Sequence, residues 1–165
     1  MYKRQVVVRE DNHVTDSTKY GPVVVGVDGS EVSQKATAYA FREAQARGAA
    51  LIAVHTWMDM QVQASLAGLS AAQSEWADIE KEQSELLTEN LKEPREEYPE
   101  VEVKKLITRD RPVSALTEAA EGAQLLVVGS HGRGGFKGML LGSTSRALLQ
   151  SAPCPMMVVR PDEES

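Results

Sequence analysis

Residues 128–144 read VGSHGRGGFKGMLLGST, and this stretch decides the fold more than any other part of the chain. It follows an apolar run, Leu125 to Val128, that is typical of a strand buried on both faces of a sheet. It ends in Gly142, Ser143 and Thr144, which predict a helix over 143–150. The glycines between them permit positive φ angles and a close approach of the main chain to a ligand. The stretch therefore predicts a strand, a glycine-rich loop and a helix in succession.

The predicted helix start at Ser143 is suited to binding an anion. The first N–H groups of a helix have no partner within it, and they lie at the positive end of its dipole. The hydroxyls of Ser143 and Thr144 can donate further hydrogen bonds to phosphate oxygens. No glycine here precedes a lysine, so the loop is not a P-loop, and no GxGxxG pattern follows the first strand. The stretch favours a phosphate-bearing ligand that is not a dinucleotide.

The rest of the chain alternates between strand and helix patterns. Apolar, β-branched runs predict strands over 22–27, 50–57, 101–108, 124–128 and 155–159. Caps and helical spacing predict helices over 31–47, 70–91, 112–121 and 143–150. Strands joined by helical crossovers of one hand predict an α/β fold, a five-stranded parallel sheet with helices on both faces.

The long helix expected over 70–91 carries an apolar stripe. At 100° per residue the stripe projects onto one broad face, which we expect to pack on the core. The charged residues opposite it are expected to be solvated. The stripe consists of Trp76, Ile79, Leu86, Leu87 and Leu91, and the charged face includes Glu75, Glu80, Lys81, Glu85 and Glu89.

Length and composition predict one domain in a reducing compartment. The chain has 165 residues and 42% hydrophobic content, within the roughly 100 to 200 residues of one domain. We expect this domain over 21–161, a flexible tail over 1–20 and a short tail over 162–165. Val6 to Val8 could add an edge strand, but the charges that follow favour disorder. A single cysteine and no apolar segment of about 20 residues indicate a cytoplasmic protein.

Charge restricts the ligand classes. A net charge of -6 argues against broad binding to nucleic acid, which needs a basic face. Arg133 and Lys137 in the glycine-rich loop could neutralise a bound anion, and Arg146 follows one turn into the helix. The histidines lack the spacing of metal ligands, so no resident metal site is expected.

The spacing Gly129-x2-Gly132-x9-Gly142-Ser143 resembles the G-x2-G-x9-G-[ST] signature of the universal stress protein family, in its ATP-binding branch. The segments VVGVDGS at 24–30 and PCPMMVV at 153–159 are also similar to that family. The resemblance covers about residues 21–161. It implies a Rossmann-like sheet, of the adenine nucleotide alpha hydrolase type, with strand order 3-2-1-4-5. A ligand crevice then forms outside the carboxyl ends of the first and fourth strands.

The resemblance further implies that the crevice holds ATP or another adenine nucleotide, with Mg²⁺ or Mn²⁺ carried by the nucleotide. Asp28 and Gly129 would meet the ribose or adenine side, although Asp28 could instead cap the next helix. Gly132 and Gly142 with Ser143 and Thr144 would hold the phosphates, and main chain around His55 and Thr56 would border the adenine. The expected nucleotide-binding residues are Asp28, His55, Thr56, Gly129, Ser130, His131, Gly132, Arg133, Gly142, Ser143 and Thr144.

The last strand, containing Met156, Met157, Val158 and Val159, is expected at the sheet edge, where a second copy could add the same strand in a homodimer. Pro155 and Pro161 could instead guard that edge. The predicted function is a nucleotide-dependent stress-response or signalling module without catalytic residues. Two alternatives remain open: a slow nucleotide hydrolase or transferase using Asp28 or His131, and an interaction module that binds no nucleotide.

Overall fold

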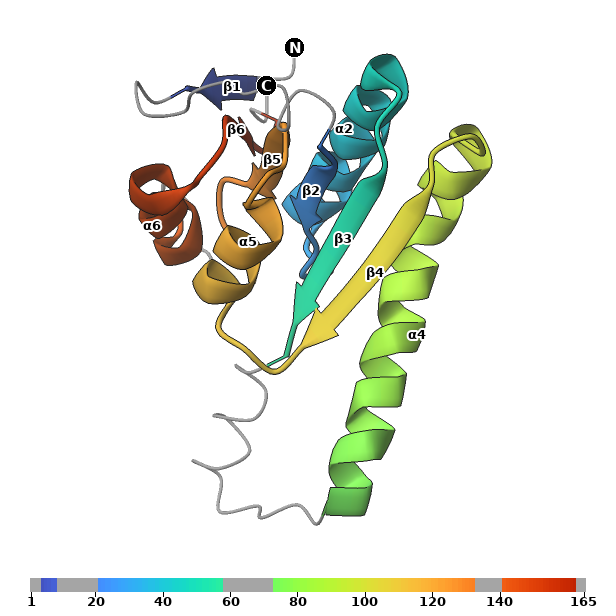
Figure 1. Ribbon diagram of the computed structural model, residues 1–165. Coiled ribbons are helices and arrows are strands. Elements are labelled where there is room, and N and C mark those ends of the chain that lie inside the picture. Colours follow the sequence, from blue (N-terminus) through green and yellow to red (C-terminus); the bar gives the residue numbers. More distant parts are fainter. Residues whose placement is uncertain (1–3, 9–20, 58–72, 133–140, 163–165) are drawn as a thin grey trace.

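The fold is a single twisted sheet covered by helices (Figure 1). The computed structural model describes residues 4–8, 21–57, 73–132 and 141–162. Within them the strand order is β1-β6-β5-β2-β3-β4. The strands are β1 (Arg4–Val7), β2 (Val23–Gly26), β3 (Leu51–Thr56), β4 (Val103–Thr108), β5 (Leu125–Gly129) and β6 (Met156–Val159). The helices are α2 (Glu31–Arg47), α4 (Gln73–Glu97), α5 (Pro112–Ala120) and α6 (Ser143–Ser151).

The strands β2 to β6 form the parallel sheet that the sequence predicts. Their order, β4-β3-β2-β5-β6, is the expected 3-2-1-4-5 arrangement, which is therefore confirmed. The expectation of five strands is wrong by one, because residues 4–7 form β1, which pairs antiparallel with β6. Disorder is therefore the wrong prediction for these four residues, and β6 is not at the edge of the sheet.

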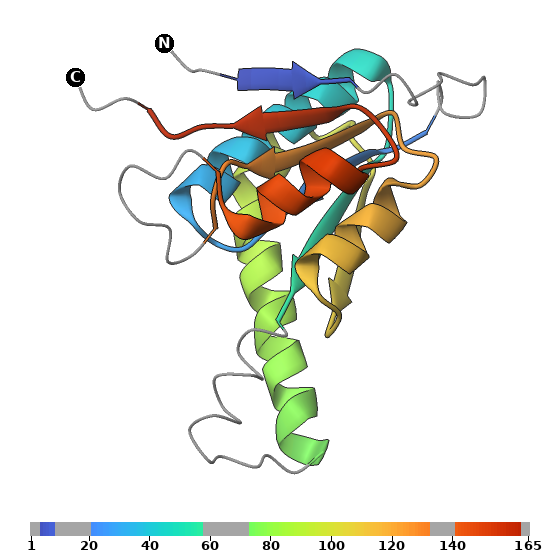
Figure 2. The ribbon, with the colours of Figure 1, turned by 90° about the vertical axis from the view of Figure 1, so that its left-hand side faces the viewer.

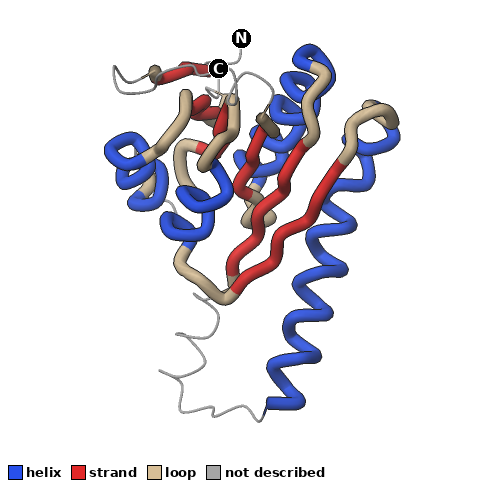
Figure 3. The backbone as a smooth tube through the Cα atoms, viewed as in Figure 1, coloured by secondary structure: helices blue, strands red, loops and turns tan. Residues whose placement is uncertain are grey.

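Alternate side chains of each strand enter two separate cores. Val23, Val25 and Val27 pack with α2 and α4, whereas Val24 and Leu126 pack with α5 and α6 on the opposite face. This alternation follows from the two-residue repeat of a strand. Helices and strands succeed one another along the chain, so each crossover returns across one face of the sheet (Figure 3).

The helix α2 begins and ends at the predicted residues because its caps are strong. The Ser30 hydroxyl accepts a hydrogen bond from the N–H of Ser33, which satisfies one donor of the first turn. Gly48, at φ 61°, ends the helix in the left-handed region, which glycine adopts without a steric penalty. Between these caps, Ala40 and Phe41 lie fully buried against the sheet.

The helix α4 is longer than predicted and presents a different stripe to the core. It continues through Pro94 to Glu97, so the predicted end at residue 91 is wrong. The ring of Tyr98 stacks on Phe41 of α2 at 6.3 Å, and this contact holds the extra turn against the domain. Leu87 and Leu91 are buried as expected, but Leu86 is 46% exposed.

The spacing of residues on α4 explains why Leu86 is exposed. Gln83 lies four residues before Leu87, so it is Gln83 that continues the buried row. The start predicted at residue 70 lies outside the described residues. Two views show that the N-terminal half of α4 projects beyond the carboxyl ends of β3 and β4 (Figures 1 and 2).

Candidate functional site

The carboxyl ends of β2 and β5 meet at the point where the chain leaves the sheet in opposite directions. These strands are parallel neighbours. The chain that leaves β2 forms α2 on one face, and the chain that leaves β5 leads to α6 on the other. Open α/β sheets bind ligands at such a switch point, because no crossover covers it. Asp28 follows β2 here, and residues 129–132 end and follow β5.

Asp28 organises the turn between β2 and α2. Its Oδ1 accepts a hydrogen bond of 2.8 Å from the N–H of Ser30, and its own N–H donates to the hydroxyl of Ser33 at 3.0 Å. The N-cap of α2 is Ser30 rather than Asp28. Asp28 therefore supports the cap through one carboxylate oxygen, which leaves Oδ2 directed elsewhere.

Gly132 lies directly against that second carboxylate oxygen. A Cβ built on Gly132 would stand 2.6 Å from Oδ2 of Asp28, closer than real Cβ contacts come. Only glycine fits here without a shift of the carboxylate. Gly132 is exposed and Asp28 is half-buried, so both border solvent. The structure thus brings together two predicted site residues from separate strand ends.

Ser130 links β6 to the start of α6. Its N–H donates to the carbonyl oxygen of Val159 at 2.8 Å, and its own carbonyl accepts from the N–H of Gly142 at 2.6 Å. Its hydroxyl lies 3.1 Å from Nδ1 of His131. Ser130 is only 1% exposed, and its two main-chain hydrogen bonds join the end of β5 to β6 and to the start of α6.

The first turn of α6 faces the same edge of the sheet. Gly142 is its N-cap, with φ −74° and ψ 169° and no side-chain cap, and the first helical hydrogen bond runs from the N–H of Arg146 to the carbonyl of Gly142 at 3.0 Å. Ser143 is exposed and Thr144 is half-buried. The first-turn N–H groups of Ser143, Thr144 and Ser145 therefore have no partner within the helix.

Ser145 fastens α6 to the end of β5, a role that the sequence analysis missed. Its hydroxyl donates to the carbonyl oxygen of Gly129 at 2.7 Å, and the residue is 3% exposed. The available signal was its spacing of three from Leu148, which places both on the inner face of α6. This bond fixes the distance between the strand end and the helix start.

Two of the predicted ligand glycines also have packing reasons to be glycine. A Cβ on Gly129 would lie 2.8 Å from Cγ1 of Val32, so glycine lets β5 approach α2. A Cβ on Gly142 would lie 3.1 Å from Cα of His131, a tight contact with main chain. Substitution at Gly142 would therefore disturb the Ser130–His131 segment as well as any ligand.

His55 and Thr56 end the neighbouring strand β3. Nδ1 of His55 lies 2.7 Å from the carbonyl oxygen of Val27, and Nε2 lies 2.7 Å from Oε1 of Gln83. Both side chains are buried, at 8% and 3% exposed. The resemblance implied a role for His55 at the nucleotide, and no sequence pattern identified Gln83 as its partner.

An aromatic and cationic cluster closes the carboxyl end of β3 and β4. The Trp57 and Trp76 rings are 5.8 Å apart, and the Arg109 guanidinium lies 4.9 Å from the first and 5.9 Å from the second. Trp57 is 1% exposed, whereas Arg109 is exposed. Cation–π contacts of this kind hold a long side chain against the aromatic surface.

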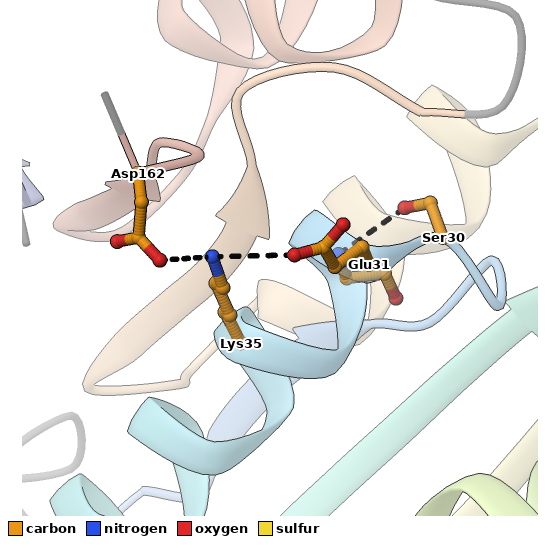
Figure 4. Close-up of polar contacts among 5 residues, drawn as sticks. Ser30, Glu31, Lys35 and Asp162 are labelled. Carbon is orange, nitrogen blue, oxygen red and sulfur yellow. Dashed lines mark hydrogen bonds and ion pairs between the residues drawn. The ribbon is translucent and has the colours of Figure 1, made fainter. Parts of the chain in front are cut away.

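Two carboxylates form ion pairs with Lys35, which lies near the start of α2. Lys35 Nζ lies 2.5 Å from Oδ2 of Asp162 and 3.5 Å from Oε1 of Glu31 (Figure 4). The hydrogen bond to Asp162 raises the pKa of Lys35 above its ordinary value of 10.5. Lys35 therefore forms ion pairs with two carboxylates, and the pair with Asp162 connects the segment after β6 to α2.

The three cations expected near a bound anion are either outside the described residues or exposed. Arg133 and Lys137 lie outside the described residues, and Arg146 is exposed on α6. No group of three or more metal-ligating side chains occurs among the residues described. Over the same described ranges, no helix is both long and apolar enough to cross a membrane.

The sequence matches one family of known proteins. The model of the Universal stress protein family matches residues 19–160. Universal stress protein Rv2005c of Mycobacterium tuberculosis is 46% identical over 154 residues, which are 93% of this chain and 50% of that protein. A universal stress protein of Mycolicibacterium smegmatis is 44% identical over 156 residues, 94% of this chain and 51% of that protein. The chain therefore spans about half the length of these relatives.

Solved structures share the fold. UspA from Lactobacillus plantarum superposes with a TM-score of 0.67 at 23% identity, covering 86% of this chain and 98% of that one. A universal stress protein in complex with cAMP gives a TM-score of 0.54 at 26% identity, covering 86% and 97%. One from Archaeoglobus fulgidus in complex with dAMP gives 0.59 at 24% identity, covering 85% and 98%. These likenesses confirm the predicted Rossmann-like α/β fold.

Proposed function

This chain belongs to the universal stress protein family, and from that membership we propose that it binds an adenine nucleotide at the carboxyl ends of β2 and β5. The ligand we propose is ATP, and the role is that of a nucleotide-dependent stress-response or signalling module in the cytoplasm. The proposal rests on one observation: Gly132, in the loop after β5, lies against the Asp28 carboxylate after β2, beside the first turn of α6.

The first turn of α6 supplies the donors for phosphate. The main-chain N–H groups of Ser143 and Thr144 have no partner within the helix, and the helix dipole favours negative charge there. The hydroxyl of Ser143 is exposed and can add a hydrogen bond. The N-cap residue, Gly142, has no side chain that could accept a hydrogen bond from the first-turn N–H groups. These donors are therefore not occupied by a side-chain cap and can bind an anion.

The nucleoside end would extend from these phosphates toward β2 and β3. Oδ2 of Asp28 is an acceptor suited to a ribose hydroxyl, since Oδ1 already accepts from Ser30. The main chain at His55 and Thr56 would border the adenine, held by the bonds of the His55 ring to Val27 and Gln83. The relative solved with cAMP supports an adenine nucleotide as the class of ligand.

A divalent cation would enter with the nucleotide. Mg²⁺ or Mn²⁺ prefers oxygen ligands and is commonly bound through substrate phosphates together with one or two carboxylates. The phosphates would supply those oxygens here, because Oδ1 of Asp28 already accepts from Ser30 and Oδ2 is assigned to the ribose. We therefore expect Mg²⁺ to strengthen the binding of ATP more than that of AMP, which has fewer phosphate oxygens.

The direct test is binding by the full chain. Calorimetry with Mg-ATP should give a measurable heat, and protein purified without added nucleotide should release an adenine nucleotide when it is denatured and examined by mass spectrometry. Absence of both results would support the alternative, an interaction module that binds no nucleotide.

A pair of variants at Ser143 separates binding from folding. Ser143→Glu places a carboxylate at the helix start, where negative charge stabilises a helix by about 0.3–1 kcal/mol but repels phosphate. We expect the affinity for ATP to fall at least tenfold, or by about 1.4 kcal/mol, without loss of thermal stability. Ser143→Gln, of similar size and no charge, is the matched control. Equal ATP affinity of both variants and the wild type would contradict the site.

Nucleotide turnover distinguishes the enzyme alternative. We expect the wild-type chain to hydrolyse ATP slowly, and Asp28→Ala to lower binding and turnover together. A loss of turnover in Asp28→Ala or His131→Ala, with ATP binding retained, would instead identify a hydrolase or transferase.

A further inference from the structure

The edge of β6 that faces away from β5 is covered by a strand of the same chain. β6 pairs parallel with β5 on one side and antiparallel with β1 on the other, as the opposed arrows show (Figure 2). All of β6 is buried, at 5% exposure or less for each residue. The register pairs Arg4 with Val159, Gln5 with Val158, Val6 with Met157 and Val7 with Met156.

The covering strand is itself weakly held. Val6 and Val7 remain 51% and 37% exposed, although both are paired with buried methionines of β6. A side chain that keeps this much contact with water gains only part of the roughly 1.5–3 kcal/mol that full burial of a valine gives. β1 is a strand of four residues, so its ladder is also short. The strand β6 is therefore apolar along its whole length, whereas the strand that pairs with it, β1, is short and partly exposed.

β1 reads RQVV and β6 reads MMVV, so the two strands share their last two residues. A second copy related by a two-fold axis would add its own β6 in the same antiparallel direction as β1. In the register that pairs Met156 with Val159, Val158 and Val159 of the second copy would stand where Val6 and Val7 stand now. Met156 and Met157 of the second copy would stand in place of Arg4 and Gln5. The second copy would thus present a more apolar strand.

We propose that β1 is a removable cap on a strand-addition site, whose alternative occupant is β6 of a second copy of this chain. The two occupants exclude each other, because the single row of main-chain N–H and C=O groups on this edge can pair with only one strand. While β1 is docked, this edge is closed to a partner. When β1 detaches, two copies pair through β6, and nucleotide binding is not needed for this exchange.

The first experiment weakens β1 without touching β6. In the full chain, the double substitution Val6→Glu and Val7→Glu places charges on the covered sides of β1, and Val8→Glu, at a residue that is 63% exposed and outside β1, is the control. Sedimentation equilibrium should give a dimer at least tenfold tighter for the double variant than for the wild type, or about 1.4 kcal/mol. The control should match the wild type. Equal dimerisation of all of these proteins would overturn the proposal.

The second experiment locks β1 in place. Val6→Cys with Met157→Cys, in a Cys154→Ala background, puts two thiols on directly opposed residues, where antiparallel strands bring side chains close enough for a disulfide. The oxidised protein should stay monomeric and the reduced protein should dimerise. Dimerisation of the locked monomer, or a disulfide that joins two copies instead of one, would overturn the cap. Gln5→Cys with Val158→Cys repeats the test if the first pair does not fold.

Titration of the locked protein with ATP keeps the two proposals separate. Its nucleotide affinity should equal that of the reduced protein at low protein concentration. Loss of dimer formation in the locked form together with absence of nucleotide binding in every form would contradict the proposed function and leave the cap intact.

Discussion

Asp28 and Gly132 lie so close that a Cβ on Gly132 would stand 2.6 Å from Oδ2 of Asp28, and a side chain there requires the carboxylate to shift. Gly132→Ala should therefore lower both thermal stability and ATP affinity. In an Asp28→Ala background the same substitution should cost little, because the clashing carboxylate is gone. Thermal unfolding of the wild type, both single variants and the double variant forms the double-mutant cycle.

The cycle has a clear negative outcome. Equal costs of Gly132→Ala with and without Asp28 would mean that the two residues do not touch in solution.

Ser145 should matter for stability more than its neighbour in the proposed site. Ser145→Ala removes the buried hydroxyl that donates to the carbonyl of Gly129 at 2.7 Å and leaves that acceptor unpaired. We expect a loss of about 1–3 kcal/mol in the free energy of unfolding. Ser143→Ala, at an exposed position, should change it by less than about 0.5 kcal/mol. Urea denaturation of both variants measures the difference, and similar losses would contradict the assigned bond.

On α4, a polar residue should be harder to replace than an apolar one. Gln83→Leu leaves Nε2 of the buried His55 without its partner at 2.7 Å, and we expect a loss of about 1–3 kcal/mol. Leu86→Gln exchanges a side chain that is 46% exposed and should be close to neutral. Chemical denaturation of both variants tests this, and a stabilising effect of Gln83→Leu would show that the His55 contact is not formed.

The thiol of Cys154 should make stability sensitive to alkaline pH. Burial raises its pKa from 9.0 to about 11. The folded state keeps the proton over a range where the unfolded state loses it, so the contribution of the thiol is complete below pH 9 and declines as the pH rises toward 11. The advantage of the wild type over Cys154→Ala should shrink across this window. A constant difference in unfolding free energy between pH 9 and 11 would contradict the assigned burial.

The local sequence was sufficient for most elements, and the family resemblance supplied the order of the five parallel strands. Gly48 and Ser30 determine the ends of α2, and the spaced glycines from Gly129 to Gly142 identify the loop that follows β5. Patterns of this kind were readable because a cap or a turn is satisfied by residues near it in sequence.

What the sequence did not reveal depends on contacts between distant segments. β1 is stabilised by pairing with β6, more than 100 residues later in the chain, and its own sequence continues into charges that suggest disorder. Pro94 does not end α4, because Tyr98 packs on Phe41 beyond it. The spacing of Gln83 and Ser145 places them on the buried faces of their helices, but it does not identify their hydrogen-bond partners, His55 and Gly129, on distant strands.

Ser130 places the capped edge and the start of α6 one residue apart. Its N–H is held by Val159, whose neighbour across the edge is Arg4, and its carbonyl holds the N–H of Gly142. A sideways displacement of β6 on exchanging one edge strand for another would therefore be transmitted through a single residue, Ser130, to the amides proposed to bind phosphate. Thermodynamic reciprocity then requires that any ligand sensitive to that displacement also bias which strand occupies the edge. We expect the apparent affinity for ATP to vary with protein concentration in the unlocked chain alone.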